Sequence, residues 1–215
     1  MRSVEDLVDV EAPAIELLRQ WAREAAVHCE ILPPGDSRDE VLLDLQVTTH
    51  STLGALAYDT GGVLIDDAWL RLLGSGHPRL ERNLSTWNAQ RADDYCLIGD
   101  DVVGGFFAIN GGALGSEIGS VYYWAPDDLD WECLDLGFTD LVHAFMSGLT
   151  AAFYESLRWP NWQADMMNVS GDRCFSYYPF LWTKEGSLET SHRSIVPVSE
   201  AFDLKMDILK QLSTR

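Results

Sequence analysis

The chain has 215 residues and carries 34 Asp and Glu against 15 Lys and Arg, so its formal net charge is −19 at pH 7. Nucleic-acid binding requires clustered cations facing the phosphates, so this balance argues against a nucleic-acid partner and against contact with anionic membranes. It favours a basic protein, such as a toxin, because opposite charges speed encounter; acidity that serves solubility alone is the plainer alternative.

The composition predicts a single globular domain over residues 1–215. Hydrophobic residues make up 47% of the chain, and at this length about 70% of the unfolded surface is buried on folding. The longest uncharged stretch, 102–116, is too short and too rich in glycine to cross a membrane. The N-terminus lacks the apolar region of a signal peptide. Four widely spaced cysteines fit buried thiols better than a zinc site or a disulfide framework: Cys29, Cys96, Cys133 and Cys174. We therefore expect a cytoplasmic protein.

Residues 1–58 are expected to be mainly helical. Apolar residues recur at helical spacing over 12–28, and Pro33-Pro34-Gly35 then breaks the chain. Ser37, followed by Glu40 three residues later, predicts a second helix that begins with a capping box. A short helix over 51–58 is also plausible from the pattern.

Residues 61–138 are expected to form the sheet. Three times, an Asp-Asp pair separates two apolar runs: 63–65 from 68–73, 95–98 from 102–109, and 120–124 from 131–136. Aspartate favours turns because its side chain bonds nearby backbone amides. We interpret the pairs at 66–67, 100–101 and 127–128 as hairpin turns and not as catalytic carboxylate dyads.

Residues 139–215 predict helices plus an aromatic strand-like segment. The pattern is helical over 139–157, strand-like over 171–182, and helical again from Ser199. Together with the preceding segments, this predicts an α+β fold in which an antiparallel, hairpin-built sheet is flanked by helices.

Sequence motifs of catalysis are absent, so no catalytic residue can be assigned, although a triad could still assemble from distant residues. No metal ion or cofactor is expected. There is no GxxxxGK[ST], no HExxH and no GxSxG. The five histidines, His28, His50, His77, His143 and His192, stand alone. The glycine-rich run 104–115 could cradle a phosphate, but it lacks Lys and Arg. A buried strand that ends in a tight hairpin turn at Asn110-Gly111 fits that run better.

The connector 74–94 contains the best candidates for a binding site. It is long for a loop in a compact domain, and such loops are often functional. The candidate residues are His77, Arg79, Trp87 and Asn88, joined by Asn110 at the end of the glycine-rich strand. An arginine beside an aromatic ring could hold an anionic ligand. A solvated loop anchored to the core by Trp87 is the alternative.

Three segments, 45–49, 61–79 and 106–126, make the chain resemble a bacterial family known only as a domain of unknown function. More distantly, Phe107-Ala108-Ile109-Asn110-Gly111-Gly112, the strand 121–124 and Phe138 resemble the SUKH (SMI/KNR-like) superfamily over about 61–153. That resemblance implies an α+β partner-binding module, and many SUKH domains are immunity proteins. The N-terminal helical region and the C-terminal segment depart from a minimal SUKH domain.

Three functions therefore remain open. The first is a non-enzymatic partner-binding module of SUKH-like immunity or regulatory type. The second is a small-molecule sensor or enzyme with a pocket near the connector 74–94. The third is an assembly subunit, for which a homo-oligomer could use the aromatic residues Trp159, Trp162, Tyr177 and Tyr178, although a core role suits these residues better.

Overall fold

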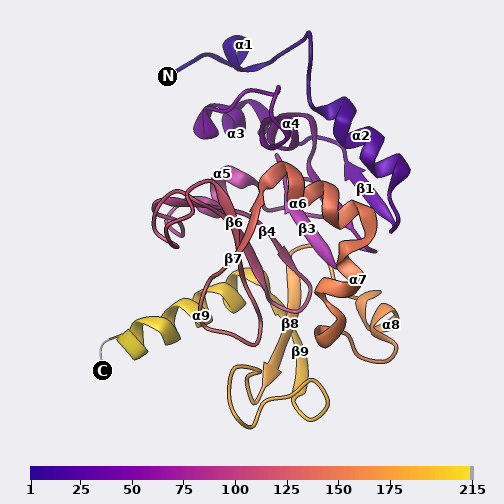
Figure 1. The fold of residues 1–215 in the computed structure, drawn as a ribbon, viewed down its shortest axis with the longest axis vertical. Coiled ribbons are helices and arrows are strands. Elements are labelled where there is room, and N and C mark those ends of the chain that lie inside the picture. The colour runs from indigo at the N-terminus through magenta and orange to yellow at the C-terminus, as the bar shows by residue number, and fades with distance from the viewer. Residues whose placement is uncertain (214–215) are drawn as a thin grey trace.

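The computed structural model describes residues 1–213, and its centre is a seven-stranded antiparallel sheet whose strands follow one another in chain order (Figure 1). This confirms the predicted α+β class. The strands are β1 (Cys29–Leu32), β2 (Gly62–Ile65), β3 (Leu70–Leu73), β4 (Tyr95–Asp101), β5 (Phe106–Asn110), β6 (Ser120–Trp124) and β7 (Glu132–Gly137). The half-buried β1 was not expected from the sequence, and it forms one edge of the sheet while β7 forms the other.

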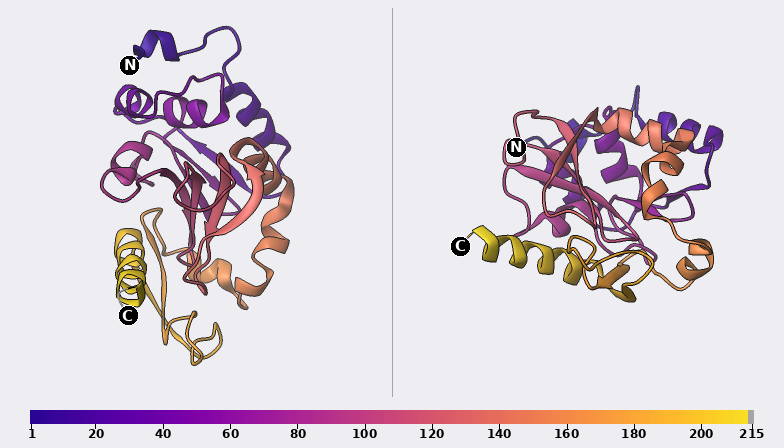
Figure 2. Two further views of the ribbon diagram at one scale, coloured as in Figure 1. Left: turned by 60° about the vertical axis from the view of Figure 1, so that its left-hand side comes forward. Right: turned by 60° about the horizontal axis from the view of Figure 1, so that its bottom comes forward.

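Four helices precede or interrupt the first strands and gather at one end of the sheet (Figures 1 and 2). They are α1 (Val4–Leu7), α2 (Ile15–Glu24), α3 (Arg38–Leu45) and α4 (Thr52–Asp59). The predicted helices over 12–28, from Ser37 and over 51–58 correspond to α2, α3 and α4. Ser51 caps α4 by accepting from the Gly54 amide, whereas Ser37 makes no such bond, so the expected capping box is wrong.

The expected helix over 139–157 is broken into shorter pieces. It comprises α6 (Phe138–Ala144), a π-helical turn (Phe145–Leu149), α7 (Thr150–Phe153) and a 3-10 turn (Glu155–Leu157). Gly148 has φ +102°, a conformation that glycine adopts without strain. At this break the Met146 carbonyl accepts from the Ala26 amide at 2.9 Å, so the chain bends where it meets the end of α2.

A second, two-stranded sheet lies at the end of the molecule opposite the N-terminal helices (Figure 1). It consists of β8 (Arg173–Tyr178) and β9 (His192–Pro197), which continues directly into α9 (Val198–Ser213). The sequence predicted a strand-like segment at β8 and the helix α9, but it did not predict β9. The Phe175 amide donates to the Val102 carbonyl at 2.7 Å and joins this ribbon to the turn after β4. Two short helices, α5 (Leu84–Asn88) and α8 (Trp162–Met166), complete the fold.

Two of the three Asp-Asp pairs lie in turns, as predicted, and the third does not. Asp66 and Asp67 adopt positive φ between β2 and β3, and residues 127–128 lie exposed after β6. Asp100 and Asp101 instead end β4 and are 0% exposed. The prediction failed there because buried cations from other segments neutralise Asp100, which local sequence does not reveal.

Asn110-Gly111 does not form the tight hairpin that was expected. The loop between β5 and β6 spans residues 111–119, and its amides and carbonyls are bonded by the Asn110 side chain. Among residues 1–213, no helix is long and apolar enough to cross a membrane.

Gly105 marks a close approach inside the β4–β5 turn. A Cβ atom added there would meet the Asp101 carboxylate and the Tyr123 hydroxyl. We therefore expect Gly105→Ala to lower the free energy of unfolding by about 1–3 kcal/mol, as overpacking does. Urea denaturation measures this. Gly137→Ala is the matched control, because its Cβ would meet nothing nearer than Asp140 at 3.9 Å; equal losses in the two variants would contradict the close approach.

Candidate functional site

A buried ion pair joins the two central strands β3 and β4. Arg71 and Asp100 face each other in the strand register, and both side chains are almost fully buried. The Arg71 guanidinium donates to the Asp100 carboxylate, to the Asp101 carbonyl at 2.7 Å and to the Arg173 carbonyl at 2.7 Å. A buried charge is tolerated only when it is paired and hydrogen-bonded, and these contacts meet that requirement for Asp100.

Arg82, in the connector, extends this pair toward the second sheet. Its Nη1 donates to Asp100 Oδ2 at 2.6 Å and its Nε donates to Asp172 Oδ1 at 2.8 Å. Asp172 also accepts from the Glu81 amide at 2.7 Å. The connector is therefore fixed to the start of β8 by charge-assisted hydrogen bonds, which are stronger than neutral ones.

Asp101 lies beside this network with a different set of partners. Its carboxylate accepts from the Tyr123 hydroxyl at 2.6 Å, the Gly105 amide at 2.7 Å and the Val103 amide at 3.1 Å. Burial raises the pKa of Asp101, although the hydrogen bonds from Tyr123 and Gly105 act in the opposite direction. Burial and the Asp101 charge raise the pKa of the Tyr154 phenol as well. This cluster therefore does not form an exposed catalytic dyad.

Three of the residues predicted from sequence to bind a ligand have their polar or aromatic groups engaged by the fold. Asn88 donates to the carbonyls of Leu84 and Leu97 and accepts from the Leu97 amide, which ties α5 to β4. Asn110 organises the loop 111–119. Trp87 is 3% exposed and lies in the core.

The two other predicted residues, His77 and Arg79, lie in the turn before α5. The Arg79 amide donates to His77 Nδ1 at 3.2 Å, and the Arg79 guanidinium pairs with Glu30 at 2.6 Å. The structure thus distributes the five candidates over the turn at 77–80, α5 and the end of β5. Their role in binding stays a prediction.

A pocket of about 350 Å³ does lie at the connector, between α5 and the second sheet. The cations over the Trp87 ring are Arg82 at 4.8 Å and Arg91 at 4.5 Å, and not the expected Arg79. Both arginines line the pocket together with Asp172. Arg91 pairs with Asp203 only at 3.6 Å, so the pocket offers a cation beside an aromatic face.

A groove of about 690 Å³ lies between the 156–160 segment and the loop that joins β8 to β9. Arg158 lies 4.5 Å from the Trp162 ring and pairs with Asp66, while Arg193 lies 4.0 Å from the Trp159 ring. Trp159 and Trp162 thus pack against cations, whereas Tyr178, another predicted aromatic candidate, is 72% exposed.

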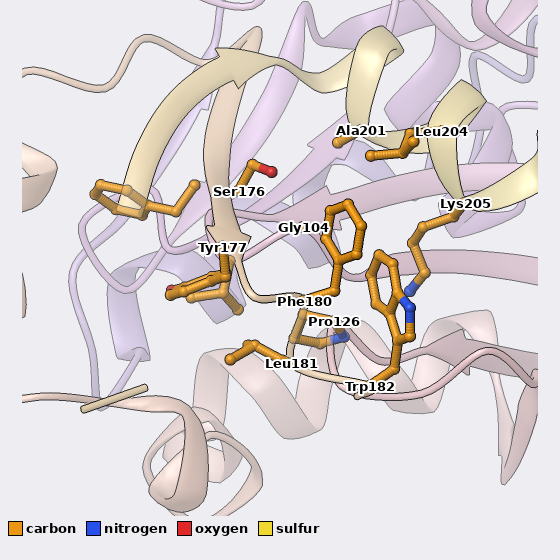
Figure 3. A pocket seen from close by; sticks show the side chains of 12 residues that line it. Gly104, Pro126, Ser176, Tyr177, Phe180, Leu181, Trp182, Ala201, Leu204 and Lys205 are labelled. Carbon is orange, nitrogen blue, oxygen red and sulfur yellow. The ribbon is translucent and has the colours of Figure 1, made fainter. Parts of the chain in front are cut away.

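A smaller cavity of about 30 Å³ lies beside the buried amine of Lys205 on α9 (Figure 3). Lys205 is 3% exposed, and its Nζ donates to the Ala125 carbonyl at 2.5 Å. Its ammonium lies 4.4 Å from the Trp124 ring and 5.7 Å from the Trp182 ring. Sequence reasoning missed this residue, although Lys205 follows Phe202 by three positions on the apolar stripe of the final helix.

Burial lowers the pKa of Lys205 to about 7. The groups that oppose this shift are Asp101 from β4, Asp127 and Asp128 from the loop after β6, and Cys174 from β8. Desolvation outweighs them because it disfavours the charged amine directly. A large fraction of Lys205 is therefore neutral near pH 7.

The edge strand β7 carries a different kind of surface. Five exposed carboxylates lie along this strand and its two flanks, and we call them the acidic edge: Asp128, Asp130, Glu132, Asp135 and Asp140. None of them forms an ion pair within residues 1–213. In the same described part of the chain, no group of three or more His, Cys, Asp and Glu side chains could hold a metal ion.

Comparison with known proteins gives the family of the chain. A family model described as "Protein of unknown function DUF2625" matches residues 4–201. The chain belongs to the DUF2625 family. A relative from Escherichia coli (strain K12), "Putative uncharacterized protein YbfG", is 41% identical over 210 residues, which are 95% of this chain and 96% of the relative. An "Uncharacterized protein" from Haemophilus influenzae (strain ATCC 51907 / DSM 11121 / KW20 / Rd) is 36% identical over 227 aligned residues, covering 97% of this chain and 100% of the relative.

The depressed pKa of Lys205 predicts how stability depends on pH in this DUF2625 protein. Between pH 7 and its ordinary value of 10.5, the unfolded chain holds a proton on Lys205 that the folded protein releases. Rising pH therefore favours the folded state by about 1.4 kcal/mol for each unit of pKa difference. We expect the stability of the wild type, relative to Lys205→Met, to rise by roughly 3–5 kcal/mol across this window. Urea titrations at several pH values measure it, and a difference that does not change with pH would contradict it.

Proposed function

We propose that the protein is a non-enzymatic module that binds a cationic protein through the acidic edge. The observation that carries this proposal is the distribution of charge along the chain. Residues 92–157 contain no Lys and no Arg but twelve Asp and Glu. This segment makes up β4 to β7 and α6, so these elements supply no Lys or Arg of their own, and the basic partners of Asp100 come from β3 and the connector.

The geometry of β7 supports docking at this edge. β7 is the last strand of the sheet, and no further strand pairs with it among the described residues. Proteins often protect an exposed edge with Lys, and here the exposed side chains at Glu132 and Asp135 are acidic. A partner that presents Lys and Arg gains attraction along the whole strand, while a second acidic protein is repelled.

An aromatic centre lies next to the carboxylates. Trp131 is half-buried between Tyr95, whose ring centroid is 5.9 Å away, and Trp124, whose centroid is 5.3 Å away. Interfaces draw most of their binding energy from aromatic and arginine anchors surrounded by weaker contacts. In this proposal, the carboxylates steer the partner and Trp131 supplies apolar contact area.

The finer version of the proposal is an immunity or regulatory role of SUKH-like type. The sequence resemblance over about 61–153 favours it, and the acidic edge lies within that range. The mechanism is occlusion, in which the acidic edge covers a basic cleft of the partner and so blocks the cleft.

Charge reversal on the acidic edge tests the proposal. The wild type, Asp130→Lys/Glu132→Lys and the control Asp39→Lys/Glu40→Lys on α3 each serve as bait for basic proteins from the source cells. A protein retained by the wild type and the control is then purified and titrated by calorimetry. We expect the β7 variant to weaken its affinity about 10- to 100-fold, and the control to change it less than about 3-fold.

Salt provides the second readout for the same interaction. Raising the ionic strength from 0.05 to 0.5 M, for example, should weaken binding of the wild type and affect the β7 variant less, because screening removes the long-range attraction. Equal affinity of the two double variants, or binding that does not depend on salt, would overturn a docking site at β7.

A second candidate function is a sensor for a small anion at the connector pocket, which Arg91 over Trp87 favours. Arg91→Gln should abolish any thermal shift that an anionic metabolite causes in the wild type, because it removes the cation. Trp87 is unsuitable as the test position since its substitution damages the core. Arg79→Gln is the control and should retain the shift; loss in both variants, or retention in both, would contradict a site at Arg91.

A further inference from the structure

Lys205 is one of only three lysines in the chain, and its surroundings differ from those of the other two. Lys184 is exposed in the loop between β8 and β9, and Lys210 is exposed near the end of α9. Lys205 lies on the apolar stripe of α9, one turn after the buried Phe202. A lysine at such a position loses hydration that a leucine would not need, so packing alone does not explain the choice of residue.

The Lys205 side chain adjoins a cavity. Lys205 lines this cavity of about 30 Å³ together with Gly104, Pro126 and Ser176, and its amine lies beside the Trp182 ring (Figure 3). The stacked rings of Phe180 and Trp182, with centroids 4.5 Å apart, form its outer wall, and both are only half-buried. This volume is about that of one water molecule in the liquid, so a ligand of a few heavy atoms also requires the half-buried rings of Phe180 and Trp182 to move outward.

One hydrogen bond fixes the direction of the amine. Lys205 Nζ donates to the Ala125 carbonyl, and no carboxylate within 4.0 Å forms an ion pair with it in the described chain. A neutral amine needs just one of its hydrogens for this bond, so the bond leaves its lone pair free to react. Lysines that react with carbonyl compounds are activated in this way, by desolvation in an apolar pocket.

We propose that Lys205 is a covalent binding site for small aliphatic aldehydes, which it holds as a Schiff base in this cavity. The amine nitrogen attacks the carbonyl carbon, and a proton passes from nitrogen to oxygen to give a carbinolamine. Loss of one water molecule then leaves the C=N double bond. The step needs no oxidant, reductant or other reactant, and it is reversed by water.

The charged groups around the amine are compatible with this chemistry. Asp101, Asp127 and Asp128 favour the ammonium form, yet burial prevails and lowers the pKa of Lys205 to about 7. Cys174 is the remaining titratable neighbour, and burial raises its pKa to about 12, so its thiol stays protonated and does not compete for the aldehyde.

Competition among the three lysines of the wild-type protein tests the proposal. Propanal and sodium cyanoborohydride are added near pH 7, and peptide mapping by mass spectrometry gives the initial rate of propyl addition at each lysine and at the Met1 amine. An ordinary lysine is almost wholly protonated at this pH, so we expect Lys205 to react at least about 10-fold faster than Lys184 and Lys210. Its rate should level off above about pH 7–8, while the other two continue to rise.

Two controls separate this site from general amine reactivity. In urea, the advantage of Lys205 should disappear, because it depends on the folded cavity. With 2,2-dimethylpropanal, which is too bulky beside its carbonyl, the rate of Lys205 relative to Lys184 should fall at least about 10-fold compared with propanal.

Either of two results would overturn the proposal. One is a native Lys205 that reacts no faster than Lys184 and Lys210. The other is a Lys205 that keeps its advantage with the bulky aldehyde, since the amine would then be reached without the cavity. Both results come from the wild-type chain, so they do not depend on whether a Lys205 variant folds.

Discussion

The fold depends on the pairing of Arg71 with Asp100 in the middle of the sheet. Removing one partner of such a pair leaves an isolated buried charge, which costs about 3–5 kcal/mol. Arg82 and Asp172 continue the pairing outward, so the central strands, the connector and the ribbon β8–β9 are held by the same alternating series of charges. The long connector thus has a structural role, because it places Arg82 between Asp100 and Asp172.

Buried and exposed aspartates of this protein differ in their partners. Inside, Asp100 is neutralised by arginines and Asp101 is satisfied by a phenol and backbone amides. Along β7, the carboxylates are left to solvent. Because every Lys and Arg lies before residue 92 or after residue 157, the basic residues are unevenly distributed along the chain. The proposed docking of a cationic partner relies on this uneven distribution, because such a field would orient the partner before contact.

Local patterns in the sequence were sufficient for the α+β class and for most strands and helices. They failed where a residue's environment is set by distant segments. Asp100 looks like a turn residue until Arg71 and Arg82 are placed beside it, and β9, with polar residues at 192–194, has weak strand character outside its pairing with β8. The candidates Asn88 and Asn110 were recognised as unusual, but the backbone groups they bond could not be inferred. Lys205 could have been recognised from the sequence, because it is a charged residue within the apolar stripe of the final helix.

The sequence separation within the charge network bears on how the chain folds during synthesis. Arg71 meets the Arg173 carbonyl across 102 positions, and Arg82 meets Asp172 across 90. All seven strands of the large sheet are synthesised before residues 171–173. Until those residues are made, Arg71 and Arg82 lack half of their hydrogen-bond partners. Such non-local contacts are slow to form, so we expect these partners to join the core late in folding. The ribbon β8–β9 thus completes the set of partners of the central arginines and is not an appendage to a finished domain.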